Sequence, residues 1–355
     1  MVVFIDNLND LRERIKGIDY SIMALIAQRI TLAKHVGILK QQAGLPVKNF
    51  QVEKQVYERI RNFAKEFQLN PDVATSIYEL LIEESVEIQL SDMVTEKSGG
   101  RCLVVGGLGE MGAWLRKFLE TTGYEVEIED KGANDILPQK IDHDYVFITT
   151  PLHTLPEVLD EVCSRVSGAV VFEVGSLKSQ IEEKVIEINR QGVELISIHP
   201  MFGPSVRHLS GRNILVCTHS GMDEQIMGRV EEIFGSTLAS LVPVPLEEHD
   251  NMMLYSLDLS HFLNLLNGRI LLNSIYSMPE LLSSAGTTFL KQFSTTSELY
   301  HENPDLYYYI QHLNKSKNRL FEEVNNALNT LIIDIQSQSK EDFVEEMHKV
   351  RDFLG

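Results

Sequence analysis

The segment LVVGGLGEMG, at residues 103–112, constrains the fold of this chain more than any other segment. A short apolar run is followed by Gly107, Gly109 and Gly112 in the spacing G-x-G-x-x-G, and a helical pattern begins directly afterwards. In this spacing the first glycine permits a tight turn, the second lets the backbone approach a pyrophosphate, and the third lets the helix pack close to the strand. The helix N-terminus then offers free N–H groups to the phosphates. We therefore expect a strand, a dinucleotide-binding turn and a helix.

The residues after this turn favour NAD over NADP. A second strand is expected over 124–129, and Asp130 follows it. A carboxylate at this place suits a free ribose 2′-hydroxyl and repels a 2′-phosphate. The alternative is a glycine-rich turn that holds no ligand. The residues expected to contact the cofactor are Gly107, Leu108, Gly109, Met111, Gly112, Asp130, Thr150 and Pro151.

The hydrophobic pattern indicates a multidomain chain with three parts and a linker. Residues 1–92 are helical in period, 93–100 form a linker, 101–245 alternate between strands and helices, and 246–355 are helical again. The alternation predicts a doubly wound, parallel α/β sheet of the Rossmann type between two all-α parts. Strands are expected near 102–106, 124–129, 145–149, 169–174, 193–198 and 213–217, and helices over 50–66, 72–92 and 248–275.

Composition narrows the partners and the compartment. A formal net charge of −19 argues against nucleic acid and against anionic membranes. Cys102, Cys163 and Cys217 are too few and too scattered for a disulfide framework or a structural zinc site, so a reducing compartment and no metal are expected. The N-terminus has no signal-peptide pattern, and no apolar run approaches the roughly 20 residues of a membrane span. A cytoplasmic protein is expected.

The first helical part predicts a homodimer with an anion site. An apolar stripe runs from Leu8 to Leu39, and three helices with so long a first member cannot bury a core alone. Arg29 and Lys40 are eleven positions apart, which places them on one helix face about 16 Å apart along the axis. Arg12 lies about 100° round the helix and could serve the pocket of a partner helix. The alternative is a bundle with solvated basic side chains.

Residues 8–90 resemble the helical chorismate mutase family, in the form fused to a dehydrogenase. The matching stretches are LRERIKGID, ALIAQRITLA, VGILKQQAGLPV and LLIEESVEIQ, and the last places Ser85 and Gln89 on one helix face. The reaction is a pericyclic rearrangement, which needs a held conformer and charge stabilisation rather than a nucleophile. The resemblance implies that chorismate is bound at its carboxylates by Arg12 of the other subunit and Arg29, at its ether oxygen by Lys40 and Gln89, and at its ring hydroxyl by Ser85 and Glu53.

Two positions depart from the mutase pattern. Val52 stands where the family usually has Arg, and Asn49 stands where some members have Asp. Val52 removes one cation from the expected pocket, for which Lys48 or Lys54 could compensate. Mutase activity is therefore a hypothesis that consumption of chorismate by the purified protein would test.

Three segments of the middle part are expected at the carboxyl ends of strands, where ligands bind in parallel sheets. They are ITTPLH at 148–153, EVGSLKS at 173–179 and SIHPMFGP at 197–204. In the last segment, Pro200 biases His199 towards an extended backbone. An imidazole whose ordinary pKa lies near about 6.5 suits a general base at neutral pH. The alternative is a polar loop histidine.

Residues 101–355 resemble the prephenate dehydrogenase family. The matching stretches are VVGGLGEMG, GSLKS, IHPMFGP, EEHDNMM, SHFLNLL and NPDLY. The resemblance implies that His199 takes the proton of the substrate's ring hydroxyl while hydride leaves the same carbon for NAD⁺ and carbon dioxide is lost. It also implies that Ser176 and Lys178 lie beside the substrate, that Lys178 pairs with a substrate carboxylate, and that His261 lies at the rim. The C-terminal helices would form a dimerisation domain.

A further departure affects the expected anion site. Glu298 stands where the family has an Arg that binds a substrate carboxylate, so an attraction is replaced by a repulsion. Lys291, Arg269 or Arg207 could supply the charge from elsewhere.

The resemblance implies a bifunctional enzyme of tyrosine biosynthesis. It would rearrange chorismate to prephenate and oxidatively decarboxylate prephenate to 4-hydroxyphenylpyruvate with NAD, with tyrosine as an expected feedback inhibitor. Three alternatives stay open: an arogenate dehydrogenase that gives tyrosine directly, a degenerate ligand-sensing paralogue with weak turnover, and an unrelated NAD-dependent hydroxyacid oxidoreductase.

Overall fold

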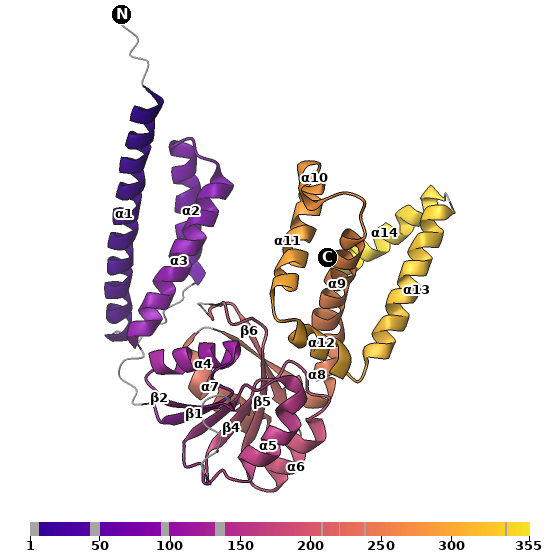
Figure 1. Ribbon diagram of the computed structural model, residues 1–355. Helices are drawn as coiled ribbons and strands as arrows, with labels where there is room; N and C mark the ends of the chain where they lie inside the picture. Colours follow the sequence, from indigo (N-terminus) through magenta and orange to yellow (C-terminus); the bar gives the residue numbers. More distant parts are fainter. Residues whose placement is uncertain are drawn as a thin grey trace, which may run out of the picture.

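The structure is a computed structural model that describes residues 7–42, 50–93, 99–131, 139–206, 209–219, 221–237, 239–337 and 339–355. Within these ranges the side chains of 41–42, 50–54, 83, 87 and 89–93 are not described. A central sheet domain carries two helical arms, one from each end of the chain (Figure 1). The expected sequence of helical, α/β and helical parts is confirmed.

The N-terminal arm consists of α1 (Leu8–Gln42), α2 (Phe50–Glu66) and α3 (Pro71–Met93), as predicted. α1 packs against α3, but much of its apolar stripe faces outward. Leu25 is 64% exposed and Leu32 is 65% exposed. A single chain therefore leaves this stripe without a cover.

One described helix, over Leu8–Lys40, is long and apolar enough to cross a membrane by length and composition. The sequence analysis expected no such stretch, because no uninterrupted apolar run approaches the roughly 20 residues of a membrane span. Arg29 contacts α3 inside the helical arm, which suits a helix of a bundle. The finding alone is weak support for a membrane span.

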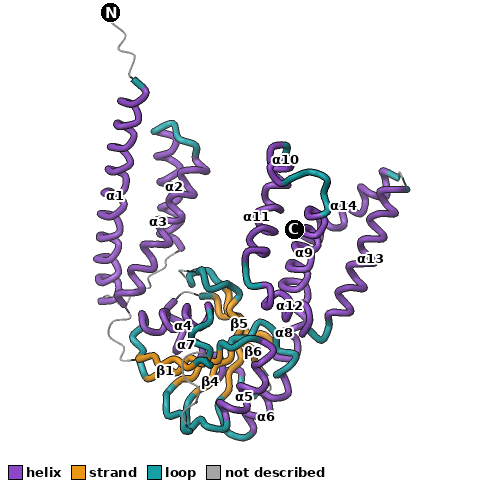
Figure 2. The backbone as a smooth tube through the Cα atoms, viewed as in Figure 1, coloured by secondary structure: helices purple, strands orange, loops and turns teal. Residues whose placement is uncertain are grey.

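The sheet contains seven strands in the order β2-β1-β3-β4-β5-β6-β7, shown in orange at the centre of Figure 2. The neighbouring pairs are parallel except β5 and β6, which are antiparallel. The wholly parallel sheet expected from the sequence is therefore wrong at this pair. The described residues between β5 and β6, 201–206 and 209–212, contain no helix to carry the chain back for a parallel pairing. The strands are β1 (Arg101–Val105), β2 (Glu125–Glu129), β3 (Tyr145–Ile148), β4 (Val170–Glu173), β5 (Leu195–Pro200), β6 (Asn213–Thr218) and β7 (Ser240–Pro245).

The sequence analysis missed β7. Pro243 and Pro245 interrupt its apolar pattern, and proline is usually confined to edge strands. β7 is the last strand in the sheet order, so it is such an edge.

Apolar cores cover both faces of the sheet, as a doubly wound fold requires. Val105 and Ile148 pack in the core beneath α5 (Leu155–Cys163) and α6 (Glu182–Arg190). Val104 and Phe147, their neighbours in sequence, pack in the other core, beneath α4 (Glu110–Thr121) and α7 (Asp223–Phe234). Short 3₁₀ turns occur at Leu152–Thr154 and Gly235–Thr237.

The C-terminal arm begins with a helix that is interrupted by a π-helical turn. α8 (Leu246–Met253) leads through the π turn at Leu254–Asp258 into α9 (Leu259–Leu272), close to the helix expected over 248–275. The arm continues with α10 (Met278–Ser283), α11 (Thr287–His301), α12 (Pro304–Leu313), α13 (Lys317–Gln336) and α14 (Lys340–Leu354). β7 ends at Pro245, and α8 begins at Leu246.

Candidate active site

The glycine turn has the geometry of a dinucleotide cradle. Gly106 has a positive φ of 84°, so the left-handed residue lies one position before Gly107, to which the sequence analysis assigned the tight turn. A Cβ on Gly112 would lie 2.3 Å from the carbonyl oxygen of Gly106, so the helix approaches the turn too closely for a side chain. Gly109 is the N-cap residue of α4 and provides no side-chain cap, which leaves the first N–H groups of the helix available for an anion.

A cleft of about 2110 Å³ opens beside this turn at the carboxyl ends of β1 to β4. Thr150 Oγ1 and Glu129 Oε2 are buried in its lining and have no hydrogen-bond partner among the described residues. Asp130 accepts a hydrogen bond of 3.1 Å from the backbone N–H of Leu108, which ties the end of β2 to the turn. Unpaired polar atoms beside a glycine cradle fit a dinucleotide with its hydroxyl groups. Six of the eight residues expected to contact the cofactor line this cleft, namely Leu108, Gly109, Met111, Asp130, Thr150 and Pro151. Ser176, which was expected beside the substrate, also lines it.

Glu129 was not predicted from the sequence. It is the last residue of β2, is only 7% exposed, and lines the same cleft as Asp130. Burial raises the pKa of its carboxyl group. Its place directly before Asp130 was visible in the sequence, but its inward orientation depends on the register of β2.

His199 lies near the end of β5, beside the cleft-lining Pro200. Its ring is 4% exposed, and Nδ1 lies 3.1 Å from Nε2 of His249. Nε2 of His199 makes no hydrogen bond with the residues that the structure describes, and this atom is not completely buried. Burial, followed by the charges of His249 and Lys178, lowers the pKa of His199 well below its ordinary value. The ring is therefore neutral at physiological pH, as a general base must be.

Lys178 does not occupy the position that the sequence analysis expected. Its side chain is 1% exposed, and Nζ donates to Glu173 Oε1 at 2.6 Å and to the carbonyl oxygens of Gly175 and Ile198 at 2.7 and 2.8 Å. An ammonium group has three donors, and all three are used. The expected contact between Lys178 and a substrate carboxylate does not agree with this geometry. Lys178 instead joins the carboxyl ends of β4 and β5.

His261 and the expected cations lie outside the cleft lining. His261 is half-buried, and its ring lies 4.8 Å from that of Tyr307. Its Nδ1 makes no hydrogen bond with the residues that the structure describes. Arg269 and Lys291 are exposed on α9 and α11. Arg207 lies outside the described residues. Glu298 is exposed and accepts a hydrogen bond of 2.9 Å from the hydroxyl of Ser294.

The described lining of the cleft has few cations for a dianionic ligand. Its lysines are Lys117, on α4, and Lys131, just after β2. On the C-terminal side the lining includes Asp305, in the first turn of α12, and Glu302, which directly follows α11. Position 298 holds Glu instead of the Arg that the family has there. Within one chain, the described lining of the cleft contains no arginine that could replace it.

The N-terminal arm brings two expected site residues together. The guanidinium of Arg29 donates to the carbonyl oxygen of Leu81 and to Ser85 Oγ. Burial lowers the pKa of Arg29, and the nearby charge of Arg59 on α2 adds to this effect. Arg59 was not singled out in the sequence, because its approach depends on how α2 packs.

The other residues expected in this site are placed only by their helices. Lys40 is half-buried on α1, and Arg12 is exposed on the same helix. Glu53 lies on α2 and Gln89 on α3, with side chains outside the described set.

Two family models match separate parts of the chain. Residues 11–90 match "Chorismate mutase type II", and residues 116–242 match "Prephenate dehydrogenase, nucleotide-binding domain". The second match begins beyond the glycine turn, so the geometry of that turn is independent support for a nucleotide site.

Similar proteins share one or both parts. The T-proteins of Haemophilus influenzae and Enterobacter agglomerans are each 24% identical, over 99% and 98% of this chain and 93% of each relative. The chorismate mutase of Methanocaldococcus jannaschii is 38% identical over 24% of this chain and 86% of its own length. A prephenate dehydrogenase from A. aeolicus, solved with hydroxyphenyl propionate and NAD⁺, has a TM-score of 0.57 at 20% identity and covers 72% of this chain and 97% of its own, which establishes the shared fold.

Proposed function

Because the chain belongs to the family of bifunctional chorismate mutase–prephenate dehydrogenases, we propose that it catalyses two consecutive steps of tyrosine biosynthesis. Chorismate is rearranged to prephenate in the N-terminal arm, and prephenate is oxidatively decarboxylated to 4-hydroxyphenylpyruvate beside the glycine cradle. The observation that carries this proposal is the presence of both matched parts in one chain, with a buried neutral histidine next to a nucleotide cleft. The family assignment favours prephenate over arogenate.

In the dehydrogenase reaction, NAD⁺ supplies the acceptor for the hydride that leaves the substrate carbon. His199 uses Nε2 to take the proton of the hydroxyl on that same carbon, so a carbonyl develops there. Loss of carbon dioxide then makes the ring aromatic and the step irreversible. Gly109 and Asp130, which line the cleft beside Ser176, would hold the cofactor together with Gly107 of the same turn.

In the mutase reaction, the protein needs to hold a compact conformer and stabilise charge on the ether oxygen. Arg29 and Ser85 are already in contact, and we assign Lys40 and Gln89 to the ether oxygen. Glu53 would meet the ring hydroxyl region, and Arg12 would come from a second copy. We assign His261 to the rim of the dehydrogenase site.

The test is production of NADH from prephenate, from arogenate and, with the mutase step included, from chorismate. We expect turnover with prephenate and its loss in His199→Asn with substrate binding mostly retained, because a positioned general base contributes about 10²- to 10⁴-fold. The lowered pKa of His199 places the acidic limb of kcat/KM below pH 6.5, since the neutral ring is the active form. Near-normal turnover of His199→Asn, or an acidic limb above pH 6.5, would contradict the role of His199. Absence of turnover with all three substrates would favour a ligand-sensing protein.

We further propose a cytoplasmic homodimer that tyrosine inhibits. The exposed stripe of α1 and the shortage of cations in one chain's cleft both call for a second copy. Three buried, free cysteines suit a reducing compartment. Tyrosine carries the same 4-hydroxyphenyl ring as the product, so adding it to the NADH assay tests inhibition.

A further inference from the structure

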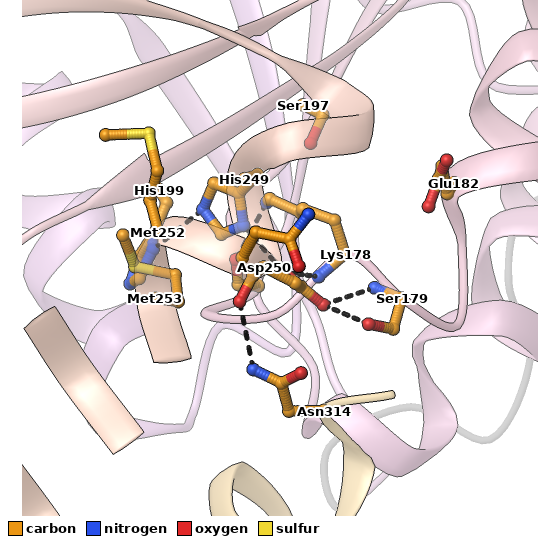
Figure 3. A network of polar contacts seen from close by, with 12 residues as sticks. Lys178, Ser179, Glu182, Ser197, His199, His249, Asp250, Met252, Met253 and Asn314 are labelled. Atoms are coloured by element: carbon orange, nitrogen blue, oxygen red, sulfur yellow. Dashed lines mark hydrogen bonds and ion pairs between the residues drawn. The ribbon is translucent and has the colours of Figure 1, made fainter. Parts of the chain in front are cut away.

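His199 is the first of three buried side chains that contact one another in series (Figure 3). Nδ1 of His199 lies 3.1 Å from Nε2 of His249, and Nδ1 of His249 lies 2.7 Å from Oδ1 of Asp250. Their exposed fractions are 4%, 0% and 3%. His249 and Asp250 belong to α8, so the series joins the C-terminal arm to the end of β5.

Asp250 fixes where the protons of this series lie. Its carboxylate accepts hydrogen bonds from the backbone N–H groups of Lys178 and Ser179 at 2.8 and 2.7 Å, and from the Ser179 hydroxyl. Burial acts to raise the pKa of Asp250, but the hydrogen bonds from His249 and Ser179 outweigh it and lower the pKa to about 2. An ionised carboxylate can only accept. Nδ1 of His249 must therefore carry the proton between them.

The position of this proton also determines which nitrogen of His199 is protonated. Burial lowers the pKa of His249, so its ring is neutral and has a single N–H, on Nδ1. Nε2 of His249 can then only accept, and Nδ1 of His199 must donate to it. Since His199 is also neutral, its lone pair lies on Nε2, the nitrogen that makes no hydrogen bond with any described residue.

We propose that His249 and Asp250 are positioning residues for the dehydrogenase reaction, because they hold His199 in the tautomer whose Nε2 can accept a proton. This inference rests on the proposed function. Neither residue needs to touch the substrate. Asn314 helps to hold α8 in place, since its amide donates to the carbonyl oxygen of Asp250 at 3.1 Å and to Oδ2 of Asp258 at 2.6 Å.

A direct test is the tautomer of His199 in the full-length protein. Nitrogen-15 NMR of protein labelled at histidine distinguishes protonated from bare ring nitrogens, and His199→Asn identifies the signals of this residue. We expect a proton on Nδ1 and a bare Nε2 near neutral pH. A proton on Nε2 would overturn the inference. The measurement needs no turnover, so its failure is distinct from failure of the proposed function.

A kinetic test uses two variants at His249 and a matched control. His249→Asn keeps an amide near Asp250 but is too short to reach His199, so we expect kcat with prephenate to fall about 100-fold or more while KM for NAD⁺ changes less than about twofold. His249→Gln can present a carbonyl oxygen to Nδ1 of His199 and should recover at least about tenfold of the lost kcat. His219→Asn makes the same substitution after β6, outside the cleft lining, and should leave kcat unchanged.

Asp250→Asn keeps the inference testable if His249→Asn does not fold. An amide nitrogen facing His249 would favour the opposite tautomers, so kcat should fall and the NMR proton of His199 should move to Nε2. A kcat within about threefold of the wild type in a folded His249→Asn or Asp250→Asn variant would show that the series is only structural.

Discussion

At the scale of single residues, Lys178 shows how burial changes the role of a charged side chain. Glu173, its ion-pair partner, is 0% exposed and also accepts from the Ser197 hydroxyl and from the backbone N–H of Gly175. Both charges are therefore fully paired inside the sheet domain. A lysine that is saturated in this way stabilises the walls of the cleft and is not available to a ligand.

The corresponding prediction concerns Lys178→Met. We expect the free energy of unfolding to fall by about 3–5 kcal/mol, because Glu173 would be left as an uncompensated buried charge. Urea denaturation measures this change. Lys184→Met, which breaks the more exposed ion pair with Asp160, is the control and should cost about 1 kcal/mol or less. A Lys178→Met variant of normal stability with a raised KM for prephenate would restore the direct substrate contact that the sequence suggested.

At the scale of elements, the sequence predicted what depends on local pattern and missed what depends on contacts between distant segments. The strands up to β6 and helices α2 and α3 follow from apolar periodicity and turn residues. β7 was missed because prolines hide an edge strand. His249 lies in a stretch that was noted for its resemblance, but its contact with His199 joins positions fifty residues apart and has no local signal.

The π turn between α8 and α9 carries a second buried carboxyl group that sequence alone did not reveal. Asp258 is 1% exposed, and its Oδ1 has no hydrogen-bond partner in the part of the chain that the structure describes. Burial raises its pKa from 3.8 to about 7, although the hydrogen bond from Asn314 acts in the opposite direction. Between these pH values the folded state binds a proton that the unfolded state has released, so this group makes the protein less stable as the pH rises towards about 7.

Asp258→Asn removes this titration and keeps an oxygen for Asn314. We therefore expect the difference in melting temperature, variant minus wild type, to be more positive at pH 8 than at pH 5. Thermal denaturation at the two pH values measures the difference. Asp305→Asn, at an exposed position at the start of α12, is the control and should show no such change. An equal effect of Asp258→Asn at both pH values would refute the raised pKa.

At the scale of the whole molecule, the C-terminal arm presents apolar residues that its own chain does not cover. Leu331 and Ile335, one turn apart on α13, are 49% and 61% exposed, and Met347 and Phe353 on α14 are 58% and 88% exposed. Soluble proteins rarely leave such large apolar patches open unless another surface covers them. We therefore expect the proposed second copy to cover these residues and the exposed stripe of α1.

The prediction at this scale concerns the double variant Leu331→Asp, Ile335→Asp. Since both side chains are exposed in one chain, the charges leave the chain's own core intact but oppose burial in a dimer interface. We expect light scattering to show two chains per particle for the wild type and one for the variant. Asn329→Asp with Gln336→Glu adds the same charge at polar positions of α13 and should remain dimeric. Because the cleft of one chain is short of cations, the monomeric variant should also lose affinity for prephenate; a monomeric wild type, or an unchanged double variant, would contradict this assembly.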